Sequence, residues 1–238
     1  MNIDQLLEHG QNHYLPNLSI DVVIIGYNDG NLKCLLLNLG DKWALPGGYI
    51  KKTESVEDAS ARVLYERTRL QNQHLKFLSV VGDGNRKFDK EFKSFFEKHG
   101  FPWKEEYWIN NRFVSLAYYA LVNIDKTHPQ PGDIGEESAW YSIHDLPEMW
   151  IDHESIIKTA RIQLKDDIKQ NPVTHNLLPD QFTMPQLHQL HQTILEEQID
   201  RSRFQKNMLL SGLFERLPKL QKESRGSNPY LYRKKQYT

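Results

Sequence analysis

Runs of apolar residues along the first part of the chain predict a series of β-strands. Residues 20–27 form a mostly apolar strand, residues 28–31 (Asn-Asp-Gly-Asn) a hairpin turn, and residues 32–37 the return strand. Further apolar stretches predict strands at 43–45, 74–81, 113–124 and 138–143. The sequence therefore indicates a sheet-containing domain.

Two helices complete this part of the chain. Apolar residues at helical spacing predict a helix over 55–67, separated by six residues from the Gly47-Gly48 pair, whose glycines would allow a tight backbone. A second helix is predicted from about 152 to 169, with Asp152 as its N-cap. Strands alternating with helices place residues 1–169 in the α/β class.

An insertion at residues 86–111 is unusually rich in aromatic side chains. Four phenylalanines follow helical spacing and four more aromatics come soon after: Phe88, Phe92, Phe95, Phe96, Phe101, Trp103, Tyr107 and Trp108. So many rings have to be buried. Two interpretations stay open: a packed insertion, or a lid over a ligand pocket in which Trp103 and Trp108 present flat faces to a base or sugar ring.

The pattern changes beyond residues 170–180, which are predicted to be a linker because Gln170-Asn171-Pro172 interrupts the helix. Thr183 is expected to cap a helix that continues to about 195, and Asp200 to cap a second helix over 201–210. Strands at 213–217 and 230–233 follow. Helix, turn, helix and hairpin is the order of a winged helix-turn-helix domain, here residues 181–238.

The first 200 residues and the C-terminal residues 201–238 carry net charges of opposite sign. Residues 201–238 hold ten Lys or Arg against two Asp or Glu, a net of +8, so the first 200 residues hold −9 of the chain's total of −1. A basic end of this kind favours nucleic acid, here a double-stranded DNA operator read by the second helix. The candidate DNA contacts are Arg201, Ser202, Arg203, Gln205, Lys206, Asn207 and, at the tip of the wing, Arg225. On the same helix, Phe204 and Met208 are expected to face the core.

The distribution of apolar residues indicates where in the cell the protein is expected. The chain contains no run of eighteen apolar residues, and its start lacks a basic region followed by an apolar stretch. We therefore expect neither a membrane span nor a secretory signal, and a cytoplasmic location. The single cysteine, Cys34, lies in an apolar run and is predicted to be a buried strand residue.

The most informative motif lies between residues 43 and 70. Glycine, five residues, glutamate, seven residues and then Arg-Glu-apolar-any-Glu-Glu-any-Gly-apolar is the pattern of the Nudix box. The chain matches it at Gly48, Glu54, Arg62, Leu64, Glu66 and Leu70. It departs at Val63, Arg67 and Arg69, where the pattern has Glu, Glu and Gly. The segment resembles a Nudix box that keeps its framework and loses part of its metal site.

The losses concern one face of the predicted helix. Positions 63, 66 and 67 share that face and would converge on Mg²⁺, which prefers oxygen ligands. Here the face offers one carboxylate, Glu66, beside the guanidinium of Arg67. At ~4 Å and an effective dielectric constant of ~20, each unit of charge repulsion amounts to ~4 kcal/mol. We expect no bound metal, no catalytic residues and at most very weak hydrolysis.

A degenerate Nudix box followed by a winged helix resembles the Nudix-related transcriptional regulators. These include the NrtR-like regulators of NAD metabolism, which respond to ADP-ribose, and the arabinose-responsive regulators of Bacteroidetes. The resemblance implies a Nudix-type α/β/α sandwich, a homodimer, and a small-molecule effector that is either a pentose sugar or ADP-ribose-like. It also implies that Glu54 and Arg62 hold the loop against the helix. Arg67 would either contact an anionic ligand or close the old site with Glu66.

Two alternatives stay open. The first is an active Nudix hydrolase with an accessory domain, which would use Mg²⁺ and replacement carboxylates from Glu105, Glu106, Glu136 or Glu137. The second is an adaptor whose basic end binds RNA or an acidic protein rather than operator DNA. His153, beside Asp152, is interpreted as a helix-start residue rather than a catalytic one.

Overall fold

The computed structural model describes residues 3–71, 74–130, 137–170, 173–220 and 228–235. Among these residues, the first domain contains a seven-stranded sheet. The main strand path is β3-β2-β1-β6-β5, with β4 paired to β1 and β7 paired to β2. β1 and β6 run parallel, whereas the other pairs are antiparallel. The strands are β1 (Tyr14–Asn28), β2 (Asn31–Leu39), β3 (Lys42–Ala44), β4 (Gly47–Lys51), β5 (His74–Val81), β6 (Val114–Leu121) and β7 (Ser138–Ser142).

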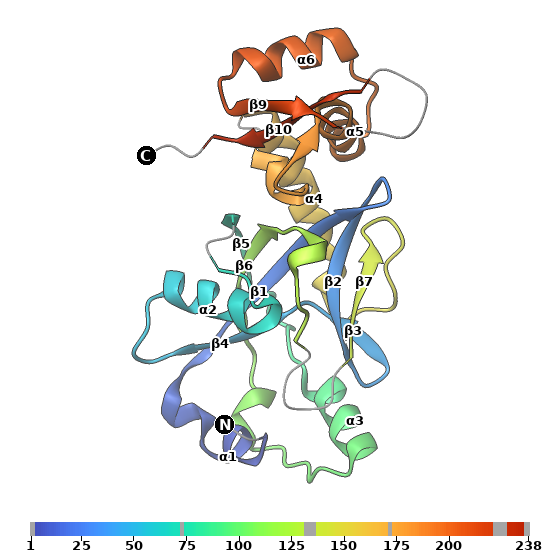
Figure 1. The fold of residues 1–238 in the computed structure, drawn as a ribbon. Helices are drawn as coiled ribbons and strands as arrows, with labels where there is room; N and C mark the ends of the chain where they lie inside the picture. The colour runs from blue at the N-terminus through green and yellow to red at the C-terminus, as the bar shows by residue number, and fades with distance from the viewer. Residues whose placement is uncertain (1–2, 72–73, 131–136, 171–172, 221–227, 236–238) are drawn as a thin grey trace.

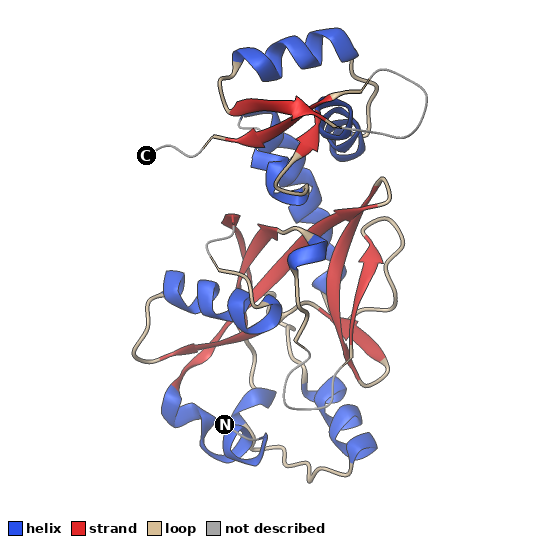
Figure 2. Ribbon diagram, viewed as in Figure 1, coloured by secondary structure: helices blue, strands red, loops and turns tan. Residues whose placement is uncertain are grey.

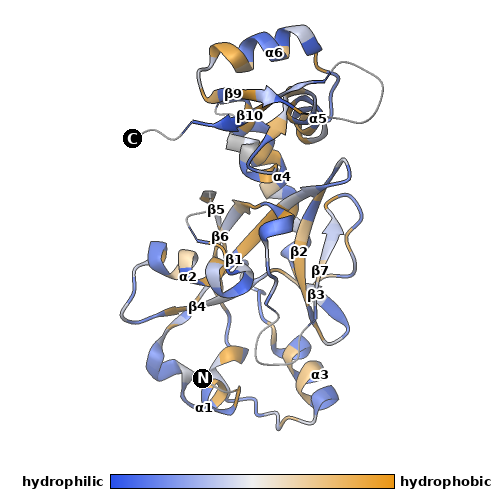
Figure 3. Cartoon of the chain, in the orientation of Figure 1, coloured by the Kyte–Doolittle hydropathy of each residue, from blue (hydrophilic) through white to orange (hydrophobic). Residues whose placement is uncertain are grey.

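The two faces of this sheet form separate cores because side chains alternate along β1. Val23 and Ile25 belong to a cluster that includes residues of α4 (His153–Gln170). Val22 and Ile24 belong to another cluster, which includes residues of α2 (Val56–Thr68). The result is the predicted α/β/α sandwich (Figures 1 and 2), in which the central strands β1 and β2 are mostly hydrophobic (Figure 3).

The aromatic insertion packs against the N-terminal helix, at the end of the molecule far from the C-terminal domain (Figure 1). Its helix α3 (Asp89–His99) and the short 3₁₀ helix η1 (Trp108–Asn110) share a third apolar cluster with α1 (Ile3–His13). The packed interpretation of the insertion is therefore confirmed. The sequence pattern did not reveal α1, whose apolar partners lie about 90 residues later in the chain.

The second domain has the predicted winged-helix order, with a three-stranded sheet β8-β10-β9 among the described residues. Thr183 forms a capping box with Gln186, and the Oδ1 atom of Asp200 accepts the backbone N–H of Arg203 at 2.6 Å, so both predicted N-caps are confirmed. Phe204 is buried and Met208 packs against the core, as expected. The elements are β8 (Phe182–Thr183), α5 (Met184–Leu195), α6 (Arg201–Leu210), β9 (Phe214–Lys219) and β10 (Tyr230–Lys234).

The two domains share one apolar core. Leu164 and Ile168 of α4 belong to the same cluster as Leu187 and Leu190 of α5, and α4 continues from the sandwich into the second domain (Figure 1). The predicted linker is also packed: it contains a 3₁₀ helix, η3 (Val173–Leu177), and Leu177 and Leu178 in it are buried. The domains are thus joined by a continuous interior.

Charged contacts reinforce this junction. Glu196 ends α5 in the left-handed conformation, with φ of 59°. Its carboxylate binds Arg161 and, at 2.5 Å, Lys165, both on α4. Burial raises the pKa of Glu196, but Lys165 and Arg161 together lower it by more, so the net shift is downward. A second, exposed pair joins Lys126 and Asp180 at 2.6 Å.

Three local expectations need correction. The strand predicted over 113–124 ends at Leu121, because the chain turns into the 3₁₀ helix η2 (Ile124–Lys126), whose N-cap Asn123 accepts the N–H of Asp125 through its Oδ1 atom. Asp152 precedes α4, but its Oδ2 atom accepts from Arg86 instead of capping the helix. Gly47 and Gly48 lie in the extended strand β4 rather than in a tight turn.

In the described ranges, no helix is both long enough and apolar enough to cross a membrane. Cys34 is fully buried in β2, as predicted, and burial raises the pKa of its thiol well above the usual range.

His191 gives the winged-helix domain a testable pH dependence. This histidine of α5 is buried against Phe204, and its Nε2 atom lies 3.0 Å from the Oγ1 atom of Thr174. Burial, assisted by the charge of His188, lowers the pKa of His191 from 6.5 to about 4.

The unfolded chain takes up a proton at His191 as the pH falls below 6.5, and the folded chain does not. Stability is therefore complete above pH 6.5 and is lost as the pH falls toward 4. Between pH 7.5 and 5.0, the free energy of unfolding should fall by about 2 kcal/mol more in the wild type than in His191→Gln. Urea unfolding of both proteins checks this, and equal pH slopes contradict it.

Candidate functional site

Arg62 fixes the loop between β4 and α2. Its Nε and Nη2 atoms donate to the two carboxylate oxygens of Glu54 at 3.0 and 2.7 Å, and Nη2 also donates to the carbonyl of Tyr49 at 2.7 Å. The hydrogen bond from Arg62 is the main reason that the pKa of Glu54 lies below its usual value. The remaining nitrogen, Nη1, donates to Glu66 at 3.0 Å. The Glu54–Arg62 pair that the family resemblance implies is thus present.

The rest of this helix face is closed by packing. Val63 is buried, and a Cβ atom added at Gly48 would lie 2.8 Å from its Cγ2 atom. A Cβ atom at Gly47 would lie 2.8 Å from the Oδ1 atom of Asp21. Glycine is therefore required at both positions by close approach of strand, helix and carboxylate rather than by backbone conformation.

Arg67 reaches back along the same face. Its Nη2 atom donates to the carbonyl of Gly47 at 3.3 Å, and its side chain lines a cavity. Glu66 forms an ion pair with Arg62. Arg67 and Glu66 thus both line the cavity.

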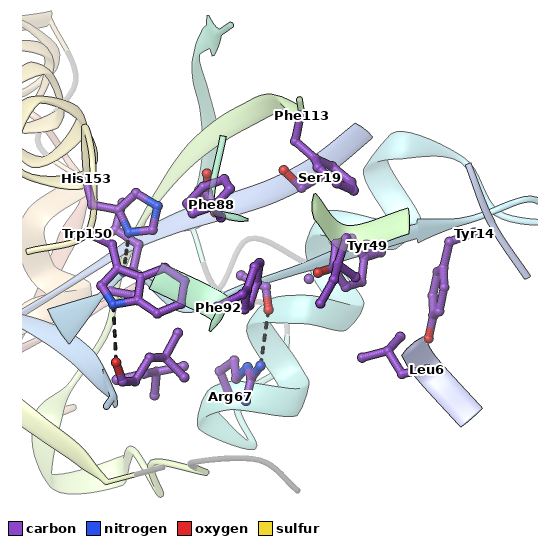
Figure 4. Close-up of a pocket in the computed structure, with 18 of the residues that line it drawn as sticks. Leu6, Tyr14, Ser19, Tyr49, Arg67, Phe88, Phe92, Phe113, Trp150 and His153 are labelled. Atoms are coloured by element: carbon purple, nitrogen blue, oxygen red, sulfur yellow. Dashed lines mark hydrogen bonds between the residues drawn. The ribbon is translucent and has the colours of Figure 1, made fainter. Parts of the chain in front are cut away.

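The cavity has a volume of about 620 Å³ and lies between the β4–α2 region and the helices α1 and α3. Phe88, Phe92, Trp150 and His153 gather at one end (Figure 4). Tyr14 and Tyr49 lie at the other end, and Arg67 lies below Phe92 in this view (Figure 4). The lid interpretation of the insertion thus has a physical basis as well, because α3 supplies part of the wall.

The two tryptophans proposed as ligand contacts lie behind the wall rather than in it. Trp108 is buried, donates its Nε1–H to the carbonyl of Leu6 at 2.7 Å, and packs 4.6 Å from the ring of Tyr49. Trp103 packs on Phe96 at 5.7 Å. The aromatic residues of the insertion that do line the cavity are four phenylalanines, Phe88, Phe92, Phe95 and Phe96.

A buried ionic cluster lies next to the end of the cavity where His153 is found. The side chain of Arg86 is completely buried, and it donates to Asp21 through Nη2 and to Asp152 through Nε, each at 2.9 Å. Its guanidinium lies 4.9 Å from the ring of Phe88. Asp21 lines the cavity itself. Sequence reasoning missed this cluster, because its members come from three separate segments with no motif in common.

The predicted DNA-contact residues lie together on α6, at the end of the molecule opposite α1 (Figure 1). Phe204 anchors the helix, whereas hydrophilic residues cover much of its length (Figure 3). Arg225, the predicted wing tip, lies outside the described residues. The exposed residues of α6 include all six predicted contacts: Arg201, Ser202, Arg203, Gln205, Lys206 and Asn207.

Comparison with known proteins identifies both domains. The model of the NUDIX domain matches residues 17–160, more than half of the chain. The chain belongs to the Nudix family. The model of the NrtR DNA-binding winged helix domain matches residues 174–233, so this Nudix protein carries an NrtR-type winged helix.

Individual relatives agree with this division. The chain is 25% identical over 209 residues to the ADPR responsive transcriptional repressor NtrR of Acinetobacter baylyi, covering 84% of this chain and 75% of the relative. It is similar to Shewanella oneidensis NrtR crystallised with a 27mer DNA, at 25% identity, a TM-score of 0.73 and coverage of 92% and 93%. A MutT/nudix family protein from Enterococcus faecalis shares the fold, at 22% identity, a TM-score of 0.67 and coverage of 99% and 94%.

The residues of this Nudix box do not fit the Mg²⁺ ion that Nudix hydrolases use. Val63 supplies no oxygen, Arg67 supplies a cation, and Glu66 is bound by Arg62. In the part of the chain that the structure describes, no group of three or more His, Cys, Asp or Glu is arranged to hold a metal.

The three proposed replacement carboxylates that the structure describes do not restore such a site. Glu105 and Glu106 lie in an exposed turn, and Glu137 is exposed beside β7. None of these three lines the cavity. Glu136 lies outside the described residues. The cavity's own carboxylates, Asp21 and Glu66, are each engaged by an arginine.

Replacing Arg62 by methionine should destabilise the sandwich by about 3 kcal/mol, because Glu54 would keep its charge in a largely buried position without its partner. The side chains of Arg62 and Glu54 are only 20% and 12% exposed. Chemical denaturation measures the loss. Lys52→Met, which removes an exposed cation from the same loop, should change the free energy of unfolding by less than about 0.5 kcal/mol. Equal effects of the two substitutions would contradict a structural role for Arg62.

Proposed function

We propose that this chain is a cytoplasmic, homodimeric transcriptional regulator whose Nudix domain binds an ADP-ribose-like effector and thereby controls operator binding by the winged helix. One observation carries the proposal: α4 begins at the cavity with His153 and continues into the core shared with the DNA-binding domain. A ligand that changes the position of this helix changes the position of α5 with it. Two relatives, a repressor from A. baylyi and the DNA-bound NrtR of S. oneidensis, support this proposal.

The cavity favours an ADP-ribose-like effector over a pentose. Its volume of about 620 Å³ lies within the range of ~300–1,000 Å³ typical of drug-sized ligands, and a single pentose is much smaller. Aromatic side chains stand at both ends of the cavity (Figure 4), and the guanidinium of Arg67 also lines it, a combination that suits two ring-bearing groups joined by a diphosphate. The relative from A. baylyi is named for its response to ADPR.

The route from effector to DNA is short and rigid. His153 and Lys165 are twelve residues apart on α4, a distance of ~18 Å along a helix. Lys165 and Arg161 bind Glu196, the residue that ends α5, and a short turn then leads to Asp200 and α6. Effector binding changes operator affinity only if the effector has different affinities for the free and DNA-bound arrangements.

The decisive experiment measures operator binding with and without candidate effectors. Fluorescence anisotropy with DNA from the region upstream of the chain's own gene should give a Kd that rises at least fivefold with saturating ADP-ribose. Arabinose and NAD should have little effect. We also propose that binding requires no divalent metal, so EDTA should leave the response unchanged. Mg²⁺-dependent release of product from ADP-ribose would instead favour the hydrolase alternative.

A double variant on α6 controls for the site of DNA binding. Arg203→Gln with Lys206→Gln removes two exposed cations and should weaken operator binding strongly and reduce its salt dependence, while ADP-ribose binding stays unchanged. Lys93→Gln with Lys98→Gln removes two cations from α3 and serves as the matched pair. Equal losses in both double variants would indicate general electrostatic attraction rather than recognition by α6.

Glu196→Gln should uncouple the two domains. The variant loses its ion pairs with Arg161 and Lys165, so the ratio of operator Kd values with and without ADP-ribose should fall toward one. Affinity for ADP-ribose itself, measured by calorimetry, should change less than about twofold. Lys126→Gln breaks the exposed pair with Asp180 and should leave the ratio intact, because exposed pairs contribute little. An unchanged ratio in Glu196→Gln would exclude this route.

A further inference from the structure

His153 holds a buried hydrogen-bond donor that the described part of the chain does not use. The residue is 4% exposed and lines the cavity. Its Nδ1 atom accepts the backbone N–H of Leu45 at 2.9 Å, and burial is the main cause that lowers the pKa of the ring. A neutral ring that accepts at Nδ1 carries its proton on Nε2. This Nε2 atom has no hydrogen-bond partner among the described residues.

The surroundings of this donor suit a flat ring. The ring of Phe88 lies 5.9 Å from His153 and 5.9 Å from Trp150, and Phe92 lies 5.2 Å from Trp150. Figure 4 shows all four side chains at one end of the cavity. Because a buried N–H without an acceptor is unfavourable, a ligand that brings an acceptor to this position gains both a hydrogen bond and ring contacts.

The charged side chains around the cavity indicate which end of such a ligand lies near His153 and which lies near α2. Around His153 the formal charges of Asp21, Asp152 and Arg86 total −1, which disfavours a phosphate there. Among the described residues, the β4–α2 region lines the cavity with three cations, Lys51, Arg62 and Arg67, and one carboxylate, Glu66. A diphosphate is therefore favoured near α2, and an uncharged ring near His153.

We propose that His153 recognises the base of the effector: an adenine ring lies against Phe88, Phe92 and Trp150, and one ring nitrogen accepts a hydrogen bond from Nε2 of His153. This assignment rests on the proposed function, which places a nucleoside diphosphate in this cavity. Adenine combines ring-nitrogen acceptors with an exocyclic amine donor. The carboxylate of Asp21, which lines the same cavity, is an acceptor for that amine.

Calorimetry on the full-length protein tests the assignment with three ligands: ADP-ribose, ADP and ribose 5-phosphate. His153→Phe should weaken ADP-ribose and ADP about tenfold, the loss expected for one buried hydrogen bond, and should leave ribose 5-phosphate unchanged because it has no base. His153→Gln can both accept from Leu45 and donate to the ligand, so its affinities should stay within about threefold of wild type. His128→Phe, an exposed histidine outside the cavity, should change nothing.

A second measurement changes the ligand instead of the protein, and it tests the proposal even if His153→Phe does not fold. Analogues of ADP in which ring N1, N3 or N7 is replaced by CH are titrated into the wild type, and one of them should bind about tenfold more weakly than ADP. Equal affinities for all analogues would overturn the role of His153 while leaving the proposed function intact, as would equal losses for ribose 5-phosphate in His153→Phe. A wild type that binds neither ADP-ribose nor ADP would overturn the proposed effector, and this assignment with it.

Discussion

The buried guanidinium of Arg86 is the interaction on which the geometry of the cavity depends. A cation taken out of water is strongly unfavourable without paired charges, so Asp21 and Asp152 have to stay within hydrogen-bond reach of it. Those two carboxylates come from the central strand β1 and from the start of α4, and Arg86 comes from the segment before α3. One side chain thereby fixes the sheet, the aromatic insertion and the helix that leads to the DNA-binding domain at a single point.

The Nudix box has a complementary role at the other side of the cavity. Arg62 and Glu54 keep the loop in place by paired hydrogen bonds, as a catalytic Nudix domain also requires, but the face that would hold metal is filled by Val63 and crossed by Arg67. The same backbone therefore presents a cation and backbone groups instead of a metal ion. In the proposed function, this surface binds a diphosphate without activating water to attack it, which is the property that a sensor needs.

Much of this architecture could be predicted from local sequence. The strands of the sandwich, the caps at Thr183 and Asp200, and the exposed residues of α6 follow from spacing and from side-chain chemistry at helix ends. The walls of the cavity could not be predicted, because they depend on contacts between distant segments. Asp152 looks like an N-cap in sequence, yet it binds a residue 66 positions earlier. Trp103 and Trp108 look like ligand contacts, yet they support the wall from behind.

The continuity of α4 has a consequence for how such proteins can be rearranged. Each residue of an α-helix turns it by 100°, so inserting or deleting one residue between His153 and Arg161 would rotate everything that follows relative to the cavity. The contacts at Glu196 and the shared apolar core would then be lost together. Exchanging DNA-binding domains between members of the family at this junction therefore requires the helix to be transferred whole, because α4 sets the angle between the two domains as well as joining them.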